Sequence, residues 1–463
     1  MRKLTTSFLF LLIGICGFSF TYVPDALAIP AFARKYDVSC VMCHTAFPKL
    51  NDFGNNFRDN GYQMGADSDL PTNQDKGYFP IAFRTTVGYE YASQNHVQGI
   101  VTGNSTDNYS SGLGSLGMDI LSAGTLDRDI SFLVVPTGEN SLLGGPATFS
   151  LESAWVRFDN LYDSPMLNVK IGYSDLDIPF SEHRSLTPSS KYAIYHYIPG
   201  VPYNSNDFPV GDSTSIAVAN KDTFAFGNHQ GVLQLMGHRV DPVGIFRYSV
   251  NLVSNNQMGG HDTGYYLHVT QSMSGGGYSS GYRGGLFYLN MPIPTVSDTQ
   301  NTAATTPALA NVGSAAKPVT KYGLDLSGNF LNSKLNVFGV YMIGQNAKEL
   351  ITGATDDAKF WGGFVEANYM ATPKLLLLAR YDVIKNTTQP VATITPVVGP
   401  AISSDGYNDV NGMTLAARYA LVIHNRGEIW AHSELNETTN KKTAFDGSDQ
   451  KNDALFLGFD FAY

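Results

Sequence analysis

The 463-residue sequence has few cysteines, little charge and, after its N-terminal region, no long apolar run. Its 3 cysteines are too few for the disulfide framework of a small secreted domain. Charged residues make up 15% of the chain, well below the roughly one quarter that is usual in soluble domains. After the first 28 residues no segment has about 18 consecutive apolar residues, so the sequence predicts no transmembrane helix. A net charge of -10 disfavours nucleic acid as a partner, and we expect none.

The first 28 residues have the features of an export signal. A basic pair near the start precedes a short apolar run over residues 8–20, and a small-x-small cleavage site follows at residues 26–28. The run is too short for a membrane span and ends at a cleavage signal, so we expect a secretory signal peptide. The mature chain would begin near Ile29, outside the cytoplasm, with Cys40 and Cys43 as its only cysteines.

Aromatic residues and glycine are abundant, and from Phe79 onward the apolar pattern has a period of two. Aromatic residues make up 12% of the chain, and there are 46 glycines. Polar and apolar residues alternate over residues 148–158 and 334–341, for example. Every second residue shares one face of a strand, and a lipid-facing apolar row opposite a polar lumen row produces this alternation. The sequence therefore predicts an all-β fold, a transmembrane antiparallel β-barrel of the outer membrane.

About 16 segments have the length of a tilted membrane strand. They begin near residues 81, 116, 128, 148, 166, 230, 243, 263, 281, 318, 334, 359, 374, 410, 427 and 453. Connections after even-numbered strands are short, such as residues 332–333, and those after odd-numbered strands are long, such as residues 95–115 and 176–229. Outer-membrane barrels have short periplasmic turns and long external loops, so we expect both chain termini in the periplasm.

The last strand supports this prediction. Its alternate residues form one apolar row that ends on the terminal aromatic residue, the usual signal for outer-membrane assembly: Leu455, Leu457, Phe459, Phe461 and Tyr463. The alternative, an edge strand of a soluble protein, would be prone to aggregation.

The segment before the barrel contains the motif Cys40-Val41-Met42-Cys43-His44. Two thiols three positions apart can form thioethers with the two vinyl groups of a haem, which makes His44 the proximal iron ligand. A zinc site would need two further ligands, and a thioredoxin-like site would need a βαβ context. The sequence therefore predicts one covalently attached haem c.

Two short helices are expected around this motif, one before Cys40 and one over residues 48–60. Phe53 and Phe57 lie on one apolar face of the second helix and are candidates for packing against the haem. Gly61 is a natural C-terminal stop.

Met64 is the main candidate for the sixth iron ligand, and a thioether there would raise the reduction potential relative to two histidines. A barrel histidine such as His229 or His238, or an open sixth position, are the alternatives. Basic side chains that can pair with the haem propionates or with lumen carboxylates are Arg34, Lys35, Lys49 and Arg58.

A segment of about 45 residues is small for a free-standing domain, so we expect it to sit in the barrel lumen as a plug. The long loop over residues 176–229 can fold into the lumen or cap its outer mouth. A metal site from Glu182, His183 and His196 is one reading of this loop, although these residues lack a tight ligand spacing. The alternative interpretation is a packed loop that binds no ligand.

Residues 29–62 resemble the fused monohaem cytochrome–porins of the outer membrane, which include the outer-membrane cytochromes of iron-oxidising bacteria. Over the barrel the resemblance covers architecture only. It implies that Cys40, Cys43 and His44 hold the haem, and it gives no match for Met64 and no direction of electron flow. The matching stretches are Pro30-Ala31-Phe32-Ala33-Arg34-Lys35-Tyr36, Cys40-Val41-Met42-Cys43-His44, Pro48-Lys49-Leu50, Phe53-Gly54-Asn55-Asn56-Phe57 and Gly61-Tyr62.

The expected organisation is a signal peptide over residues 1–28, a monohaem cytochrome c segment over 29–75 and an outer-membrane β-barrel over 76–463. The expected function is single-electron transfer between an extracellular donor, with Fe(II) or another redox-active metal or mineral in first place, and a periplasmic cytochrome or other carrier. The alternatives are outward transfer to external metal oxides and a diffusion porin with a haem-bearing plug. No hydrolase or transferase motif is present, so any enzymatic role is at most that of an Fe(II):cytochrome c oxidoreductase.

Overall fold

The structure is a computed structural model of the chain. It describes residues 31–46, 48–65, 71–72, 80–98, 105–140, 148–187, 189–203, 220, 222, 224–254, 263–274, 281–293, 316–389, 391–396, 398–424 and 427–462. The predicted signal peptide and Tyr463 lie outside these residues. None of the helices among them is long and apolar enough to cross a membrane.

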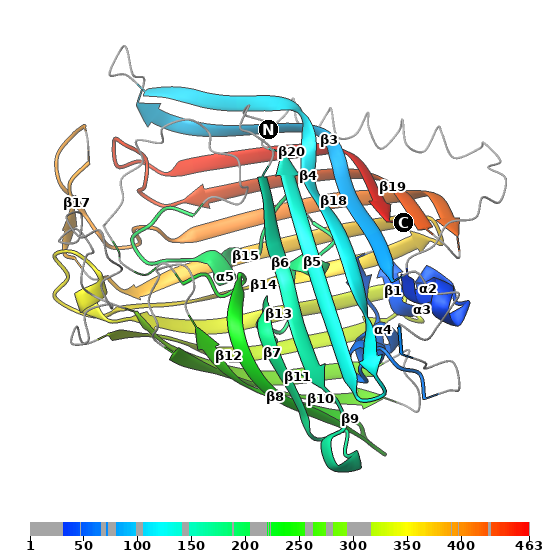
Figure 1. Cartoon of the computed structure of the whole chain (residues 1–463). Coiled ribbons are helices and arrows are strands. Elements are labelled where there is room, and N and C mark those ends of the chain that lie inside the picture. Colours follow the sequence, from blue (N-terminus) through cyan, green and yellow to red (C-terminus); the bar gives the residue numbers. More distant parts are fainter. Residues whose placement is uncertain are drawn as a thin grey trace, which may run out of the picture.

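Sixteen antiparallel strands form one closed barrel (Figure 1). The last strand pairs with the first, with Leu455 opposite Tyr91. Closure leaves no free strand edge and pairs the backbone groups between strands, which a lipid environment requires. The predicted fold class is therefore confirmed. In order around the barrel the strands are β3 Ile81–Gln98, β4 Ser105–Asp127, β5 Ile130–Asn140, β6 Thr148–Phe158, β7 Asn168–Asp175, β8 His229–Asp241, β9 Gly244–Ser254, β10 Thr263–Ser274, β11 Gly281–Ile293, β12 Lys317–Phe330, β13 Leu335–Asn346, β14 Ala358–Thr372, β15 Leu375–Thr388, β18 Val410–His424, β19 Gly427–Asn440 and β20 Gln450–Ala462.

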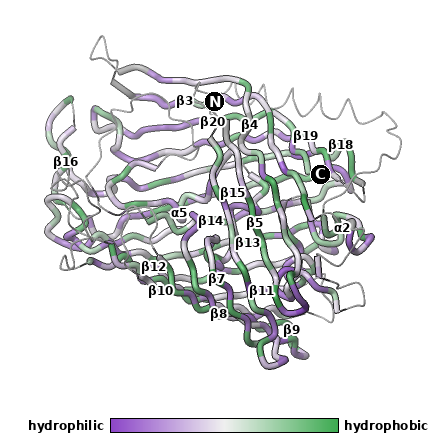
Figure 2. The backbone as a smooth tube through the Cα atoms, viewed as in Figure 1, coloured by the Kyte–Doolittle hydropathy of each residue, from purple (hydrophilic) through white to green (hydrophobic). Residues whose placement is uncertain are grey.

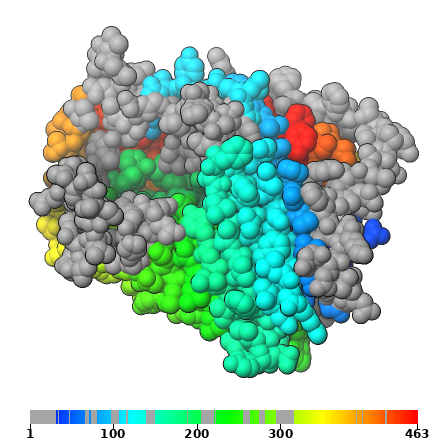
Figure 3. Space-filling view, in the orientation of Figure 1, coloured from blue at the N-terminus to red at the C-terminus, as the bar shows by residue number. Residues whose placement is uncertain are grey.

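The two faces of the barrel wall differ in polarity. In β8, Leu233 is exposed on the outside and Gln234 is buried inside; in β20, Phe459 and Asp460 divide in the same way. Figure 2 shows the resulting alternation of apolar and polar residues along the strands, and Figure 3 shows the continuous outer wall formed by β4 to β8. An apolar exterior around a polar interior is the pattern of a membrane-spanning barrel.

The predicted strand starts lie within three residues of the observed ones, with one exception. β4 begins at Ser105 rather than near residue 116, and Gln98 still pairs with Ser105. The predicted long loop over residues 95–115 is therefore wrong. Its serine, asparagine, aspartate and glycine content is typical of loops, but strand pairing with its neighbour overrides this weak local preference.

Connections alternate in length as predicted, which gives the barrel a short-turn end and a long-loop end. The short-turn end includes the connections β12–β13 and β14–β15, and the β6–β7 connection carries the 3-10 helix η1 Leu161–Asp163. The N-terminal helices and the end of β20 lie at this end (Figure 1). The long-loop end carries η5 Lys348–Leu350 and a small hairpin of β16 Thr393–Ile394 and β17 Ile402–Ser403.

The loop between β7 and β8 folds into the lumen, which excludes the alternative that it only caps the mouth. It contains η2 Glu182–Arg184 and α5 Ala193–His196. The Tyr192 ring stacks on Phe364 of the barrel wall, with ring centroids 4.0 Å apart. Other buried loop residues join the same core against the wall: Ile194, Tyr195, Tyr197, Phe224 and Phe226.

The N-terminal segment consists of α2 Ala31–Tyr36, α3 Cys40–Cys43, β1 His44–Ala46, β2 Lys49–Leu50 and α4 Asp52–Asp59. The predicted helix over residues 48–60 therefore begins later than expected. Asn51 is its N-cap and accepts a hydrogen bond from the Gly54 backbone N–H at 2.9 Å, because an asparagine side chain can satisfy an otherwise unpaired helix N–H. Gly61 follows the helix with φ 72°, the left-handed conformation that ends many helices.

The apolar outer face predicts that a charged substitution there destabilises the barrel by an amount that depends on its depth in the membrane. Leu324 lies six residues before the end of β12 at Phe330, about 15 Å above the short-turn end for a strand tilted by ~40°, near the middle of an apolar band ~25 Å tall. Leu324→Arg should lower the free energy of unfolding by about 2–4 kcal/mol, measured by urea titration in lipid vesicles.

Leu113→Arg is the matched control. Leu113 is exposed but lies fourteen residues from the end of β4 at Asp127, about 35 Å up and beyond the band. Its cost should be about 0–1 kcal/mol. Equal costs at both positions would contradict this placement of the membrane.

Candidate haem site

The cysteine motif forms a short helical turn that α4 fastens. Cys40 and Cys43 bound α3, and residues three apart are neighbours on a helix surface. The Cys43 carbonyl accepts a hydrogen bond from the Asn51 backbone N–H at 2.9 Å. The Asn51 side-chain amide donates to the carbonyls of Val41 at 3.2 Å and Met42 at 3.0 Å. One asparagine therefore caps α4 and fixes the motif's backbone at once.

Gly54 is required for this close packing. A Cβ atom on Gly54 would lie 2.2 Å from the Cys43 carbonyl oxygen, which no side chain can tolerate. Sequence reasoning did not identify Gly54 as a positioning residue, although its place in the motif Phe53-Gly54-Asn55 was a visible signal.

The two thiols are not poised for redox chemistry of their own. Neither cysteine is part of a disulfide bond in the described part of the chain. Burial, together with Glu428, raises the pKa of Cys40 to about 12, and burial raises the pKa of Cys43 to about 11. Thiol–disulfide catalysts depend on a lowered thiol pKa, so this environment argues against a thioredoxin-like site.

His44 has the geometry of a metal-ligating histidine. Its Nδ1 lies 3.2 Å from the Pro48 carbonyl oxygen. A carbonyl can only accept, so Nδ1 carries the proton and Nε2 carries the lone pair. Burial lowers the pKa of His44 to about 4, which keeps the ring neutral. Ligating histidines commonly donate their other ring N–H to a backbone carbonyl in this way.

A cavity of about 900 Å³ lies between the N-terminal segment and the inward loop, and His44 and Phe53 line it. This volume is within the range of roughly 300–1,000 Å³ that is usual for ligand sites. The lining contains three aspartates, Asp52, Asp59 and Asp177, and five basic residues, Lys49, Arg58, Arg184, Arg247 and Arg283. The excess of basic side chains fits a cofactor that carries carboxylates, as haem does through its propionates.

Of the four basic residues predicted to pair with haem propionates or lumen carboxylates, two line this cavity. Lys49 and Arg58 line this cavity, whereas the Lys35 ammonium lies 5.3 Å from the Tyr36 ring centroid. The side chain of Arg34 lies outside the described residues.

Met64 and Phe57 lie away from this cavity. They belong to an aromatic cluster with Tyr62 and Trp155 of the barrel wall. The thioethers that line the cavity within the described residues are Met42, Met273 and Met370. Ligation by Met64 and packing of Phe57 on the haem stay predictions, and neither is supported by this arrangement.

The barrel histidines weighed as alternatives are also elsewhere. His229 lines a different cavity, and His238 is not part of the lining around His44. The barrel histidine in that lining is His268, whose Nε2 lies 3.0 Å from an Asp325 oxygen.

Ion pairs seat the segment in the short-turn end of the lumen. Asp59 of α4 bonds to Arg247 of β9, with Nε to Oδ2 at 2.7 Å. Burial alone would raise the pKa of Asp59, but the guanidinium groups of Arg247 and Arg58 outweigh it and lower the pKa to about 2. Arg157 of β6 donates to the Arg58 carbonyl at 2.8 Å. Lys49 donates to the Asn336 side chain at 2.9 Å.

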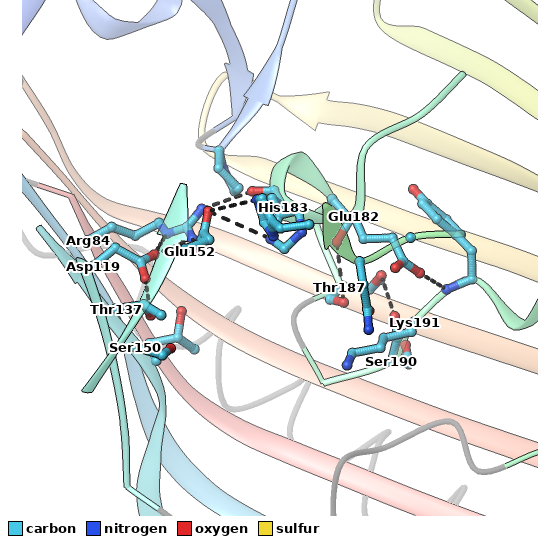
Figure 4. A pocket seen from close by; sticks show the side chains of 18 of the residues that line it. Arg84, Asp119, Thr137, Ser150, Glu152, Glu182, His183, Thr187, Ser190 and Lys191 are labelled. Atoms are coloured by element: carbon cyan, nitrogen blue, oxygen red, sulfur yellow. Dashed lines mark hydrogen bonds and ion pairs between the residues drawn. The ribbon is translucent and has the colours of Figure 1, made fainter. Parts of the chain in front are cut away.

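The predicted trio Glu182, His183 and His196 is not one cluster. His196 Nε2 lies 2.5 Å from the Glu182 carboxylate. His183 turns instead toward Glu152 and His229 on the barrel wall (Figure 4). This second group lines a separate cavity of about 450 Å³. Sequence reasoning missed it because its three members come from a loop and two strands that are far apart in the chain.

The sequence matches no family model, and a search of curated proteins gives no match. Among solved structures, the chain is similar to an anion-selective porin from Comamonas acidovorans, with 12% identity and a TM-score of 0.49, over 83% of this chain and 99% of that one. It is also similar to OprB of Pseudomonas putida, with 11% identity and a TM-score of 0.45, over 82% of this chain and 94% of that one.

The ion pair between Asp59 and Arg247 predicts the effect of one isosteric substitution. Asp59→Asn removes the carboxylate that pairs with Arg247 but leaves the second partner of Arg247, Asp177. We expect the segment to lose about 2 kcal/mol of docking free energy, below the ~3–5 kcal/mol of a buried charge with no partner left. Limited proteolysis of the folded protein measures this as faster cleavage between segment and barrel. Asp163→Asn, in the exposed turn η1, is the control and should cleave at the wild-type rate; equal rates for all three proteins would contradict the seating.

The same contact predicts a pH dependence. The pKa of Asp59 is lowered from 3.8 to about 2, so its contribution is complete above about pH 4 and is lost as the pH falls through 2. The difference in cleavage rate between wild type and Asp59→Asn should therefore shrink between pH 4 and pH 2. A difference that stays constant over this range would exclude the ion pair as its cause.

Proposed function

We propose that this protein is an outer-membrane c-type cytochrome that moves single electrons between an extracellular donor, Fe(II) in first place, and a periplasmic carrier. The observation that carries the proposal is the seating of the Cys40–His44 motif in the lumen, with the lone pair of His44 on Nε2 beside a cavity of about 900 Å³. The group held there would be one haem c, attached through Cys40 and Cys43, which are neighbours of the lining residues Val41, Met42 and His44 but do not line the cavity themselves.

The haem supplies a one-electron couple between ferric and ferrous iron. The residues of the chain do the rest. Pro48 holds the His44 ring through its carbonyl. Asn51 and Gly54 hold the motif against α4. The basic side chains of the lining would pair with the haem carboxylates, and residues of the inward loop form part of the same lining.

The position of the segment supports transfer across a membrane. The short-turn end of an outer-membrane barrel faces the periplasm, and the segment sits at that end. The loop that enters from the long-loop end meets it in one buried cluster, to which Leu186 of the loop and Ala46 of the segment both belong. Residues of both therefore surround the cavity, and a haem held there would lie between the two sides of an otherwise insulating membrane.

Outward transfer to external metal oxides uses the same parts in reverse. The discriminating measurement is the midpoint potential of the haem. A strongly positive value supports oxidation of Fe(II), and a strongly negative value supports reduction of external oxides.

A diffusion porin with a haem-bearing plug is the second candidate, and the barrel itself favours it, because barrels of about 16 strands leave room for an aqueous channel. Conductance in planar bilayers separates the two. A wide conductance that does not depend on haem supports the porin, and a closed barrel supports the electron conduit.

The proposal predicts rapid reduction of the purified, haem-loaded protein by Fe(II) under anaerobic conditions, followed by visible absorbance at working pH. Replacing both thiols, Cys40→Ala with Cys43→Ala, should abolish covalent haem because no thioether can form. Asp163→Asn should retain it. Haem-loaded wild-type protein that stays oxidised in excess Fe(II) would exclude this donor.

A further inference from the structure

We propose that Glu152, His183 and His229 form a binding site for a divalent transition-metal ion inside the lumen, and that Fe(II) bound there is the donor of the proposed electron transfer. The inference rests on the proposed function for the identity of the ion. The site itself rests on geometry alone, and the two parts can fail separately.

The three side chains surround a gap of the right size. Their ligand atoms all lie within 4.8 Å of one another. Glu152 Oε1 lies 3.7 Å from His183 Nδ1 and 3.9 Å from His229 Nε2. These separations are too long for hydrogen bonds. They are close to the ~3.4 Å between ligands in a tetrahedral site with bonds of about 2.1 Å, and the separation between the two histidine ligand atoms is at most 4.8 Å.

Two histidines and one carboxylate with open positions are the ligand set of many non-haem Fe(II) proteins. The open positions are what an electron-donating substrate ion requires, because it must enter and leave. A closed four-residue site would instead hold a structural ion.

A β-bulge directs Glu152 into the lumen. Leu151 pairs with Pro136 and Ser153 pairs with Val135, so Glu152 is the extra residue between them. Leu151 is 47% exposed and Ser153 is 3% exposed, so the two residues beside Glu152 differ sharply in burial although they have the same parity. Bulges are common beside functional sites, and Glu152 lines the same cavity as both imidazoles.

His183 and His229 are also held in place. Arg84 of β3 donates to the His183 carbonyl at 2.9 Å, which fixes η2 against the wall. The rings of His183 and His229 lie 4.0 Å apart. Arg84 contacts Glu152 at 3.6 Å, but its closer partner is Asp119, so Glu152 is not committed to it.

The surrounding charge suits a cation. The lining of this cavity contains four carboxylates, Asp119, Glu152, Glu182 and Asp460, and three basic residues, Arg84, Lys191 and Arg418. The cavity around His44 has the opposite balance. A cation is thus favoured in the cavity beside Glu152, and a cofactor with carboxylates is favoured in the cavity beside His44.

The two cavities adjoin. Ser185 and Tyr192 line both, and Pro48, whose carbonyl accepts from His44, lines the metal cavity. In the transfer step a bound Fe(II) would lose one electron to become Fe(III), and a ferric haem attached at Cys40 and Cys43 would accept that electron and become ferrous. No bond forms or breaks in the protein.

The binding test uses Zn²⁺, which cannot donate an electron, with purified haem-loaded protein and isothermal titration calorimetry. Wild type should bind one Zn²⁺ at this site. Glu152→Gln, which keeps the shape of the side chain, and His183→Ala and His229→Ala should each weaken binding at least tenfold. His96→Ala removes a histidine that contacts Ser448 outside the cluster and should bind as wild type does. Wild-type affinity in all three site variants would overturn the site.

The second readout is the rate of haem reduction by Fe(II) in the same proteins. The site variants should reduce at least tenfold more slowly at low Fe(II), with an unchanged midpoint potential, whereas His96→Ala should match wild type. Weakened Zn²⁺ binding with an unchanged rate would overturn the role as donor site and leave the conduit standing. Zn²⁺ binding at the site without any reduction by Fe(II) in wild type would instead overturn the proposed donor.

Discussion

The ion pair between Asp59 and Arg247 is the contact on which the arrangement of the lumen depends. It joins the N-terminal segment to the barrel wall, and Arg247 extends it to Asp177 of the inward loop. Three parts of the chain far apart in sequence therefore meet at one guanidinium group. Buried charges of this kind are costly unless they are fully paired, so the segment, loop and wall are stable in this arrangement only together.

The lumen contains two cavities whose lining residues have opposite balances of charge. The cavity beside His44 has an excess of basic residues, and the cavity beside His183 has an excess of carboxylates. The inward loop forms the boundary, because Ser185 and Tyr192 line both. A barrel of this size without a loop or plug would leave an aqueous channel, and here the loop and the segment occupy that space.

Much of the fold could be predicted because the barrel imposes a period of two on most of the chain. The row from Leu455 to Phe461 could be assigned to the outer face from the sequence, and the alternation of short and long connections could be predicted as well. The extension of β4 toward Ser105 could not be predicted, because residues 105–115 resemble a loop in sequence and become a strand only by pairing with β3. The bulge at Glu152 was missed as well, although the consecutive polar residues Glu152 and Ser153 interrupt the alternation over residues 148–158.

The candidate site could be predicted only where its residues lie close together in the sequence. Cys40, Cys43 and His44 are adjacent in the chain, and the Pro48 carbonyl that orients His44 is four residues away. Met64 was an inference from proximity in sequence, whereas the structure places it in an aromatic cluster and not in the lining of the cavity beside His44. Arg247, His183 and His229 come together only through the closed barrel, so no local pattern could identify them.

The most direct test of the account is electron transfer across a sealed membrane. Haem-loaded protein is reconstituted into vesicles that contain a trapped oxidised soluble c-type cytochrome, and Fe(II) is added outside under anaerobic conditions. The account predicts that the trapped cytochrome is reduced, and that vesicles with the Cys40→Ala, Cys43→Ala protein leave it oxidised. A trapped cytochrome that stays oxidised although the protein's own haem is present and the vesicles are intact would contradict the account.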